Sequence, residues 1–115
     1  MSAVETKPAG YDLLERASGV ELPEAGVLSR TLAKGVGVRV TWFGFAAGEE
    51  LSEHTSSRPA LLHFLRGRAR LTLGADTVEV GPGDHLRMEA GLSHSVAALE
   101  PLEFVLTLLP AGPAA

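Results

Sequence analysis

Alternation of apolar and polar residues is clearest in the second half of the chain. Residues 68–73 alternate arginine or threonine with alanine or leucine, which predicts a strand with one buried and one solvated face. After the turn residues 74–76, residues 77–80 alternate again. The two segments therefore predict a β-hairpin.

Several other short segments are rich in β-branched, aromatic or leucine residues and end at Gly, Pro or Asp. They predict strands at residues 38–43, 61–65, 86–88, 94–97 and 103–109. Residues 11–26 hold only scattered apolar positions, compatible with a short strand or one turn of helix. Short strands separated by turns favour an all-β sandwich or barrel over a βαβ fold.

The last predicted strand is apolar on both faces. Leu102, Phe104, Leu106 and Leu108 share one face, and Val105 lies on the other with Leu109. Such a strand is either central in its sheet or covered by a partner subunit.

Composition limits the classes of function. The length of 115 residues predicts one domain with a core at about 27–110 and loose tails at 1–8 and 111–115. A net charge of −4 gives no basic surface for nucleic acid. The chain has no cysteine, which excludes disulfides and thiolate ligands and leaves His, Asp and Glu as strong metal ligands.

Neither residues 1–10 nor residues 104–109 show the pattern of a targeting signal or of a membrane span. Residues 1–10 lack the basic and apolar regions of a signal peptide, and the apolar residues 104–109 are too few to span a bilayer. We therefore expect a cytoplasmic protein with no membrane partner.

The candidate chemistry centres on His54 and His94. Each lies in a strand-like segment bracketed by glycine, residues 48–67 for His54 and residues 83–94 for His94. In a small all-β barrel, two such strands bring one imidazole each to a shared interior. We therefore expect the two rings to face each other across one cavity.

These positions resemble the two motifs of the cupin family. In the first motif Gly48, His54 and Gly67 match without insertion. The family's second histidine falls on Ser56, and its glutamate falls on Ala60.

In the second motif Gly83, Gly91 and His94 match, while the family's proline falls on Glu89 and its asparagine on Ala98. The resemblance extends over residues 38–109 and is nearest to small one-domain cupins of the RmlC-like, conserved-barrel type. It implies an all-β, double-stranded β-helix (jelly-roll) barrel. Family habit, together with the two-faced last strand, implies a homodimer.

The resemblance also implies a metal site of three histidines and one carboxylate that holds iron, manganese, zinc or nickel. Carried over residue by residue, only His54 and His94 remain as metal ligands. If strand parity holds, His63 points away from this site, although a bulge near Pro59 would bring it in as a third ligand. His85 shares parity with Arg87 and is predicted to lie on the surface.

Other candidates for the wall of the cavity follow from parity and composition. Ser52 and Ser56 share the parity of His54, and Trp42, the only tryptophan, is either a core residue or part of the wall. Glu89 is predicted to be a solvated turn carboxylate, and Arg66, Arg68 and Arg70 a solvated face. Catalytic residues cannot be assigned, because no acid that would orient a Ser–His pair is evident.

Two functions remain open at this point. The first is a cupin barrel that binds a small molecule, with at most a weakly held divalent metal. The second is a metal-dependent oxygenase or isomerase acting on a small polar metabolite. A third, purely structural dimer has less support.

Overall fold

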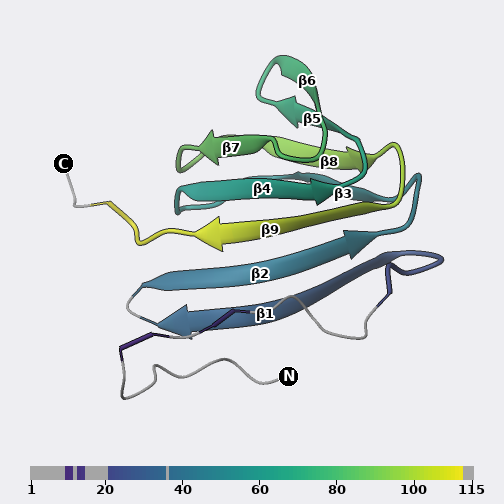
Figure 1. Ribbon diagram of the computed structural model, residues 1–115. Coiled ribbons are helices and arrows are strands. Elements are labelled where there is room, and N and C mark those ends of the chain that lie inside the picture. Colours follow the sequence, from purple (N-terminus) through teal and green to yellow (C-terminus); the bar gives the residue numbers. More distant parts are fainter. Residues whose placement is uncertain (1–9, 12, 15–20, 36, 113–115) are drawn as a thin grey trace.

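The computed structural model describes residues 10, 11, 13, 14, 21–35 and 37–112, and in these residues it contains strands and no helix (Figure 1). The strands are β1 (Val27–Gly35), β2 (Val38–Phe45), β3 (Glu50–His54), β4 (Ala60–Arg66), β5 (Ala69–Leu73), β6 (Asp76–Val80), β7 (His85–Met88), β8 (His94–Ala98) and β9 (Leu102–Leu108). No helix in this part of the chain could therefore cross a membrane.

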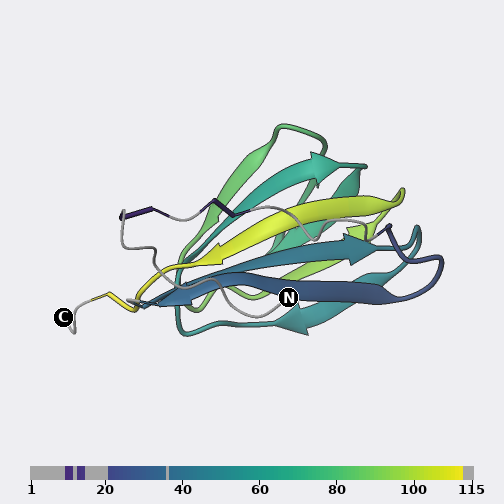
Figure 2. The same cartoon turned by 60° about the horizontal axis from the view of Figure 1, so that its bottom comes forward.

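The strands form two antiparallel sheets that pack face to face (Figure 2). One sheet has the order β1-β2-β9-β4-β7 and the other the order β3-β8-β5-β6. The chain crosses repeatedly from one sheet to the other, which is the arrangement of a jelly roll. The predicted all-β, double-stranded β-helix is confirmed.

Every strand predicted from the pattern is present, but two were missed. β1 was not predicted at all, and β3 was not given bounds, because His54 was placed only in a strand-like segment at residues 48–67. Residues 21–26 carry neither strand nor helix, and the predictions for residues 1–8, 12, 15–20 and 113–115 lie outside the described residues.

Alternation along β4 fills the space between the sheets. Ala60, Leu62 and Phe64 are buried, whereas the odd-numbered residues from Leu61 to Leu65 are exposed. The ring of Phe64 lies 5.3 Å from that of Phe104, centroid to centroid. Burial of large apolar side chains from both sheets is the main source of stability in such a fold.

β9 is the central strand of the five-stranded sheet, between β2 and β4. Leu102 and Phe104 are buried in the main core, and Val105 on the other face packs against a second cluster that contains Leu32 and Trp42. A central position therefore accounts for the two apolar faces, and the pattern of this strand gives no separate support for a homodimer.

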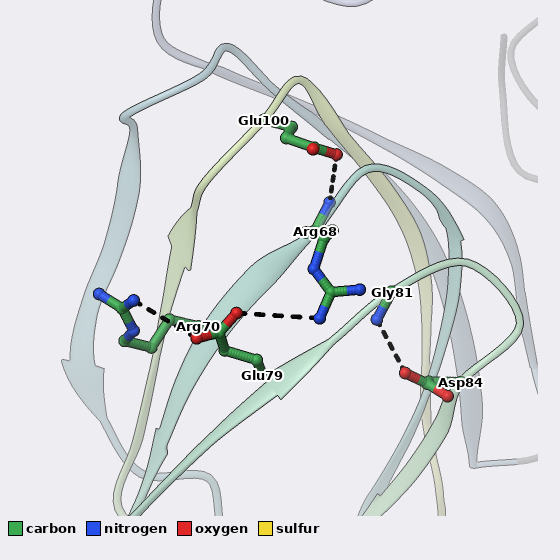
Figure 3. Close-up of polar contacts among 6 residues, drawn as sticks. All are labelled: Arg68, Arg70, Glu79, Gly81, Asp84 and Glu100. Atoms are coloured by element: carbon green, nitrogen blue, oxygen red, sulfur yellow. Dashed lines mark hydrogen bonds and ion pairs between the residues drawn. The ribbon is translucent and has the colours of Figure 1, made fainter.

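The three arginines predicted to form a solvated face are exposed: Arg66 ends β4, and Arg68 and Arg70 lie at the β5–β6 hairpin (Figure 3). Nη2 of Arg68 and of Arg70 lie 3.8 and 3.5 Å from the carboxylate of Glu79. The turn that follows is closed by the backbone N–H of Gly81, which donates to Oδ2 of Asp84 at 2.8 Å. Because the three side chains of these two ion pairs are about half exposed, each ion pair stabilises the fold by only about 0–1 kcal/mol.

Close packing requires a glycine between β4 and β5. Gly67 has a φ of +81°, and a Cβ at this position would lie 2.0 Å from the carbonyl oxygen of Pro101. The corresponding motif glycine Gly83 has a φ of +90°, but a Cβ there would meet no atom within 4 Å. Gly67 is therefore fixed by a backbone contact as well as by its dihedral angle.

Candidate functional site

The two motif histidines lie next to each other on neighbouring strands. His54 ends β3, His94 begins β8, and the two are direct partners in the antiparallel pairing. Their ring centroids are 4.2 Å apart, with 59° between the ring planes. The structure therefore brings the rings together as expected, but side by side on one sheet and not across the cavity from each other.

A β-bulge places His54 on the inner face. Leu51 pairs with Val96 and His54 with His94, so β3 advances by one residue more than β8 between the two pairs. This extra residue reverses the alternation, and Leu51 and His54 both come to the inner side of the sheet.

Both rings are oriented by backbone carbonyl groups. Nδ1 of His54 lies 2.7 Å from the carbonyl oxygen of Ser52, and Nδ1 of His94 lies 2.8 Å from that of Leu92. Because a carbonyl oxygen only accepts, each Nδ1 carries the proton and donates. In the neutral ring, Nε2 then bears a lone pair that can accept a hydrogen bond or bind a metal ion.

A cavity of about 200 Å³ lies beside the ring pair and takes its walls from both sheets. Its polar side chains are His54, Ser56, Arg58, Glu89 and His94, and its apolar ones are Ala60, Met88, Leu92, Leu106 and Leu108. His94 is 6% exposed, whereas His54 is exposed. The buried ring thus lies in the wall and the exposed ring at the mouth.

Ser56 and Ala60, which replace a histidine and a glutamate of the cupin motif, both line this cavity. The carbonyl oxygen of Ser56 accepts a hydrogen bond of 2.7 Å from the backbone N–H of Gly91. This bond joins the first motif to the second. The two motifs therefore meet at the cavity, as the resemblance implies.

Two residues predicted for the wall lie elsewhere. Ser52 lines a different hollow with Glu53 and Ser95, because the bulge breaks the parity that related it to His54. Trp42 lies on the outer side of the five-stranded sheet, where it is 1% exposed and its Nε1–H donates to Oε2 of Glu103 at 2.7 Å. Trp42 is therefore a core residue, and the structure does not bring it to the histidine pair.

His63 also lies outside the cavity. It is exposed on the outer face of β4 and stacks on its strand partner His85, with ring centroids 4.1 Å apart and 15° between the planes. No bulge near Pro59 brings it inward, since β4 pairs in register with β7 from Ala60 to His63. The predicted third metal ligand is therefore not at the site, and His85 lies on the surface as expected.

Sequence reasoning missed the part that Arg58 takes in the cavity. Arg58 has the same parity as Ser56 and Ala60, so the alternation itself would have placed it in the wall. Its Nε donates to the carbonyl oxygen of Leu109 at 2.7 Å, and its Nη2 also donates to the carbonyl oxygen of Gly37. Arg58 thus ties the first motif to the β1–β2 turn and to the end of β9.

Glu89 is solvated, as expected, and it also lines the cavity, which was not predicted. It lies in the cavity wall, yet its side chain is 81% exposed and its Oε1 is 3.9 Å from Nη1 of Arg87. It is therefore a solvated carboxylate at the mouth.

The described residues do not fit the four-ligand metal site that the resemblance implies. His54 and His94 supply two imidazoles, but Ser56 and Ala60 stand in place of the other ligands. Within the described ranges, no group of three or more His, Cys, Asp or Glu side chains could hold a metal ion. Two imidazoles alone are fewer ligands than metal centres of this kind use.

Comparison with known proteins gives one family. The sequence profile of a family described as "Cupin domain" matches residues 41–108. No curated protein sequence matches the chain.

Several solved structures are similar to this chain over most of the length of both proteins. A cupin superfamily protein from Desulfitobacterium hafniense DCB-2 is 28% identical with a TM-score of 0.78, over 95% of this chain and 99% of that one. A conserved protein of unknown function from Streptococcus pyogenes is 26% identical with a TM-score of 0.75, over 100% and 98%. An RmlC-like cupin from Shewanella frigidimarina, at 14% identity, a TM-score of 0.75 and coverage of 88% and 93%, supports the fold alone.

Proposed function

This chain belongs to the cupin family, and from that premise we propose that it binds a small molecule in the cavity beside His54 and His94. The observation that carries the proposal is the cavity of about 200 Å³, in which a few polar groups converge on an apolar wall. Such a combination is typical of small-molecule sites, where apolar contact supplies affinity and polar groups supply orientation.

The imidazoles supply the orienting groups. Their Nδ1–H bonds to backbone carbonyls hold the rings in place and keep Nε2 as an acceptor in the neutral form. A ligand N–H or O–H, or a bridging water, would satisfy the buried Nε2 of His94 better than an apolar group would.

The size of the cavity limits the ligand. An engineered cavity of about 150 Å³ holds benzene. A cavity of about 200 Å³ therefore suits a ligand of roughly six to eight non-hydrogen atoms, and a larger ligand would extend through the mouth past His54.

The direct test is a panel of probes that share a five-carbon chain and differ in the charge and hydrogen-bonding capacity of the head group: pentanoate, pentanamide and pentan-1-amine. Methyl NMR would follow Met88 and Leu106 in the cavity wall, with the exposed Leu61 and Val78 as controls. We expect at least one probe to shift the cavity methyls in a saturable manner and to leave the control methyls unmoved. If all three probes at millimolar concentration leave the cavity methyls unchanged, the proposal is wrong.

A metal-dependent oxygenase or isomerase is the second candidate, and one observation favours it. Metal-binding histidines commonly donate their other ring N–H to a carbonyl or carboxylate, as both rings do here. The incomplete ligand set weighs against it, so we propose that any divalent ion is held weakly.

Metal analysis separates the two candidates. For protein purified without chelator or affinity tag, we expect iron, manganese, zinc and nickel each well below one ion per chain. A stoichiometric metal that is lost in His94→Ala but retained in His85→Ala would favour the enzyme instead. His85 is the matched control because it belongs to the histidine pair outside the cavity.

A further inference from the structure

Arg58 lines the cavity, and none of the described residues neutralises its positive charge. Its hydrogen-bond acceptors are the carbonyl oxygens of Leu109, Gly37 and Leu108, the last at 3.4 Å from Nη2. All three acceptors are uncharged. Among the described residues, no carboxylate forms an ion pair with this guanidinium.

The guanidinium also has donors to spare. It carries five N–H groups in a fixed fork, and the three hydrogen bonds use those of Nε and Nη2. The N–H groups of Nη1 have no acceptor among the described residues. A partly buried guanidinium with unused donors is a favourable partner for a planar anion, because charge-assisted hydrogen bonds are stronger than neutral ones.

Ser56 adds a second donor to the same cavity. Its Oγ accepts a hydrogen bond of 3.1 Å from the backbone N–H of Arg58, which orients the hydroxyl. The hydroxyl proton is not used in that bond and can be donated to a ligand. The residue that replaces a metal-binding histidine thus offers a donor to an anion.

We propose that the ligand of this cavity is a small organic carboxylate with a short apolar chain. The carboxylate oxygens accept from Arg58 and Ser56, and the chain lies against Met88, Leu106 and Leu108. Because a carboxylate has no hydrogen to donate, a bridging water donates both to it and to Nε2 of His94. This assignment rests on the proposed small-molecule function and adds the chemical class of the ligand. By the size of the cavity, a chain of about five carbons fits.

Glu89 is the group that opposes an anion, and its position limits the opposition. Its side chain is 81% exposed, and its nearest cation is Arg87, at 3.9 Å. Solvent screens the interaction of such a charge with a ligand deeper in the cavity. The charge nevertheless acts at the mouth, so Glu89→Gln should strengthen carboxylate binding by about two- to fivefold.

The decisive test compares pentanoate with pentanamide on the unmodified protein, by calorimetry or NMR titration. The two molecules have nearly the same shape, but pentanoate is an anion that only accepts hydrogen bonds, whereas pentanamide is neutral and both donates and accepts. We expect pentanoate to bind at least tenfold more tightly, and its affinity to fall as salt is added. If pentanamide binds as tightly as pentanoate, the carboxylate assignment is overturned while the small-molecule function stands. If neither these two nor pentan-1-amine binds, both proposals fail.

Variants then identify the anion-binding group. Arg58→Gln should weaken pentanoate binding at least tenfold and pentanamide binding by a clearly smaller factor, because only pentanoate also loses a charge interaction. Arg70→Gln removes the same charge on the outside of the hairpin, where Arg70 contacts Glu79, and should change neither affinity by more than about twofold. Equal loss in both arginine variants would show that net charge, and not a contact of Arg58, attracts the ligand, which would overturn the assignment. If Arg58→Gln does not fold, the probe comparison on the unmodified protein still decides.

Discussion

At the scale of single residues, two features matter most: the orientation of the two motif histidines and the absence of a side chain at Gly67. His54 and His94 are each held by one hydrogen bond to a carbonyl two residues earlier, so local backbone geometry sets their orientation. Gly67 has a steric role, because the absence of a side chain allows the β4–β5 connection to approach Pro101. The two motif histidines therefore have a chemical role, whereas Gly67 has a steric one.

Two glycine variants separate a steric contact from a dihedral effect. Gly67→Ala should destabilise the protein by more than about 3 kcal/mol, since a positive φ and a clash with the Pro101 carbonyl act together. Gly83→Ala carries the positive φ without the clash and should cost about 1–2 kcal/mol. Urea unfolding followed by the fluorescence of Trp42 would measure both; equal losses would contradict this explanation.

At the scale of the strand, alternation predicted most of the fold and part of the site. It gave the hairpin, the outward direction of His63 on β4 and the position of Ser56. It failed at Ser52, because the extra residue in β3 leaves no mark on the apolar pattern. A bulge is set by the pairing of β3 with β8, which is a long-range property that local periodicity does not carry.

Neighbouring leucines on β4 provide a test of the alternation. Leu62 is 2% exposed and Leu61 is 42% exposed, so the two differ in burial but not in chemistry or strand. Leu62→Ala should lower the free energy of unfolding by about 2–4 kcal/mol, and Leu61→Ala by less than about 0.5 kcal/mol. Comparable losses at the two positions would show that Leu61 is covered, as it would be in a dimer formed through this face.

At the scale of the whole molecule, the fold could be predicted from the sequence, but the residues that line the cavity could be predicted only in part. Glycine-framed motifs specify a barrel whose two sheets bring the motifs together, and the structure does so through the Ser56–Gly91 hydrogen bond. Parity alone places Arg58 in the cavity wall, but its hydrogen bonds to the end of β9 and to the β1–β2 turn could not be predicted, because these acceptors lie far from it in sequence. The homodimer and the cytoplasmic location stay predictions; sedimentation velocity at micromolar concentration would test the first.

The most direct measurement follows the imidazole nitrogens of all four histidines by ¹⁵N NMR during titration with pentanoate. The chain provides its own control, since His54 and His94 form a pair at the cavity and His63 and His85 form a pair outside it. In the neutral rings before addition, the tautomer with the proton on Nδ1 should give Nε2 of His54 and His94 the signal of a nitrogen without a proton. On addition, both Nε2 signals should move and saturate together, while those of His63 and His85 stay fixed. Movement of the outer pair alone, or no movement at saturating concentrations of the probe, would contradict the assignment of the ligand site.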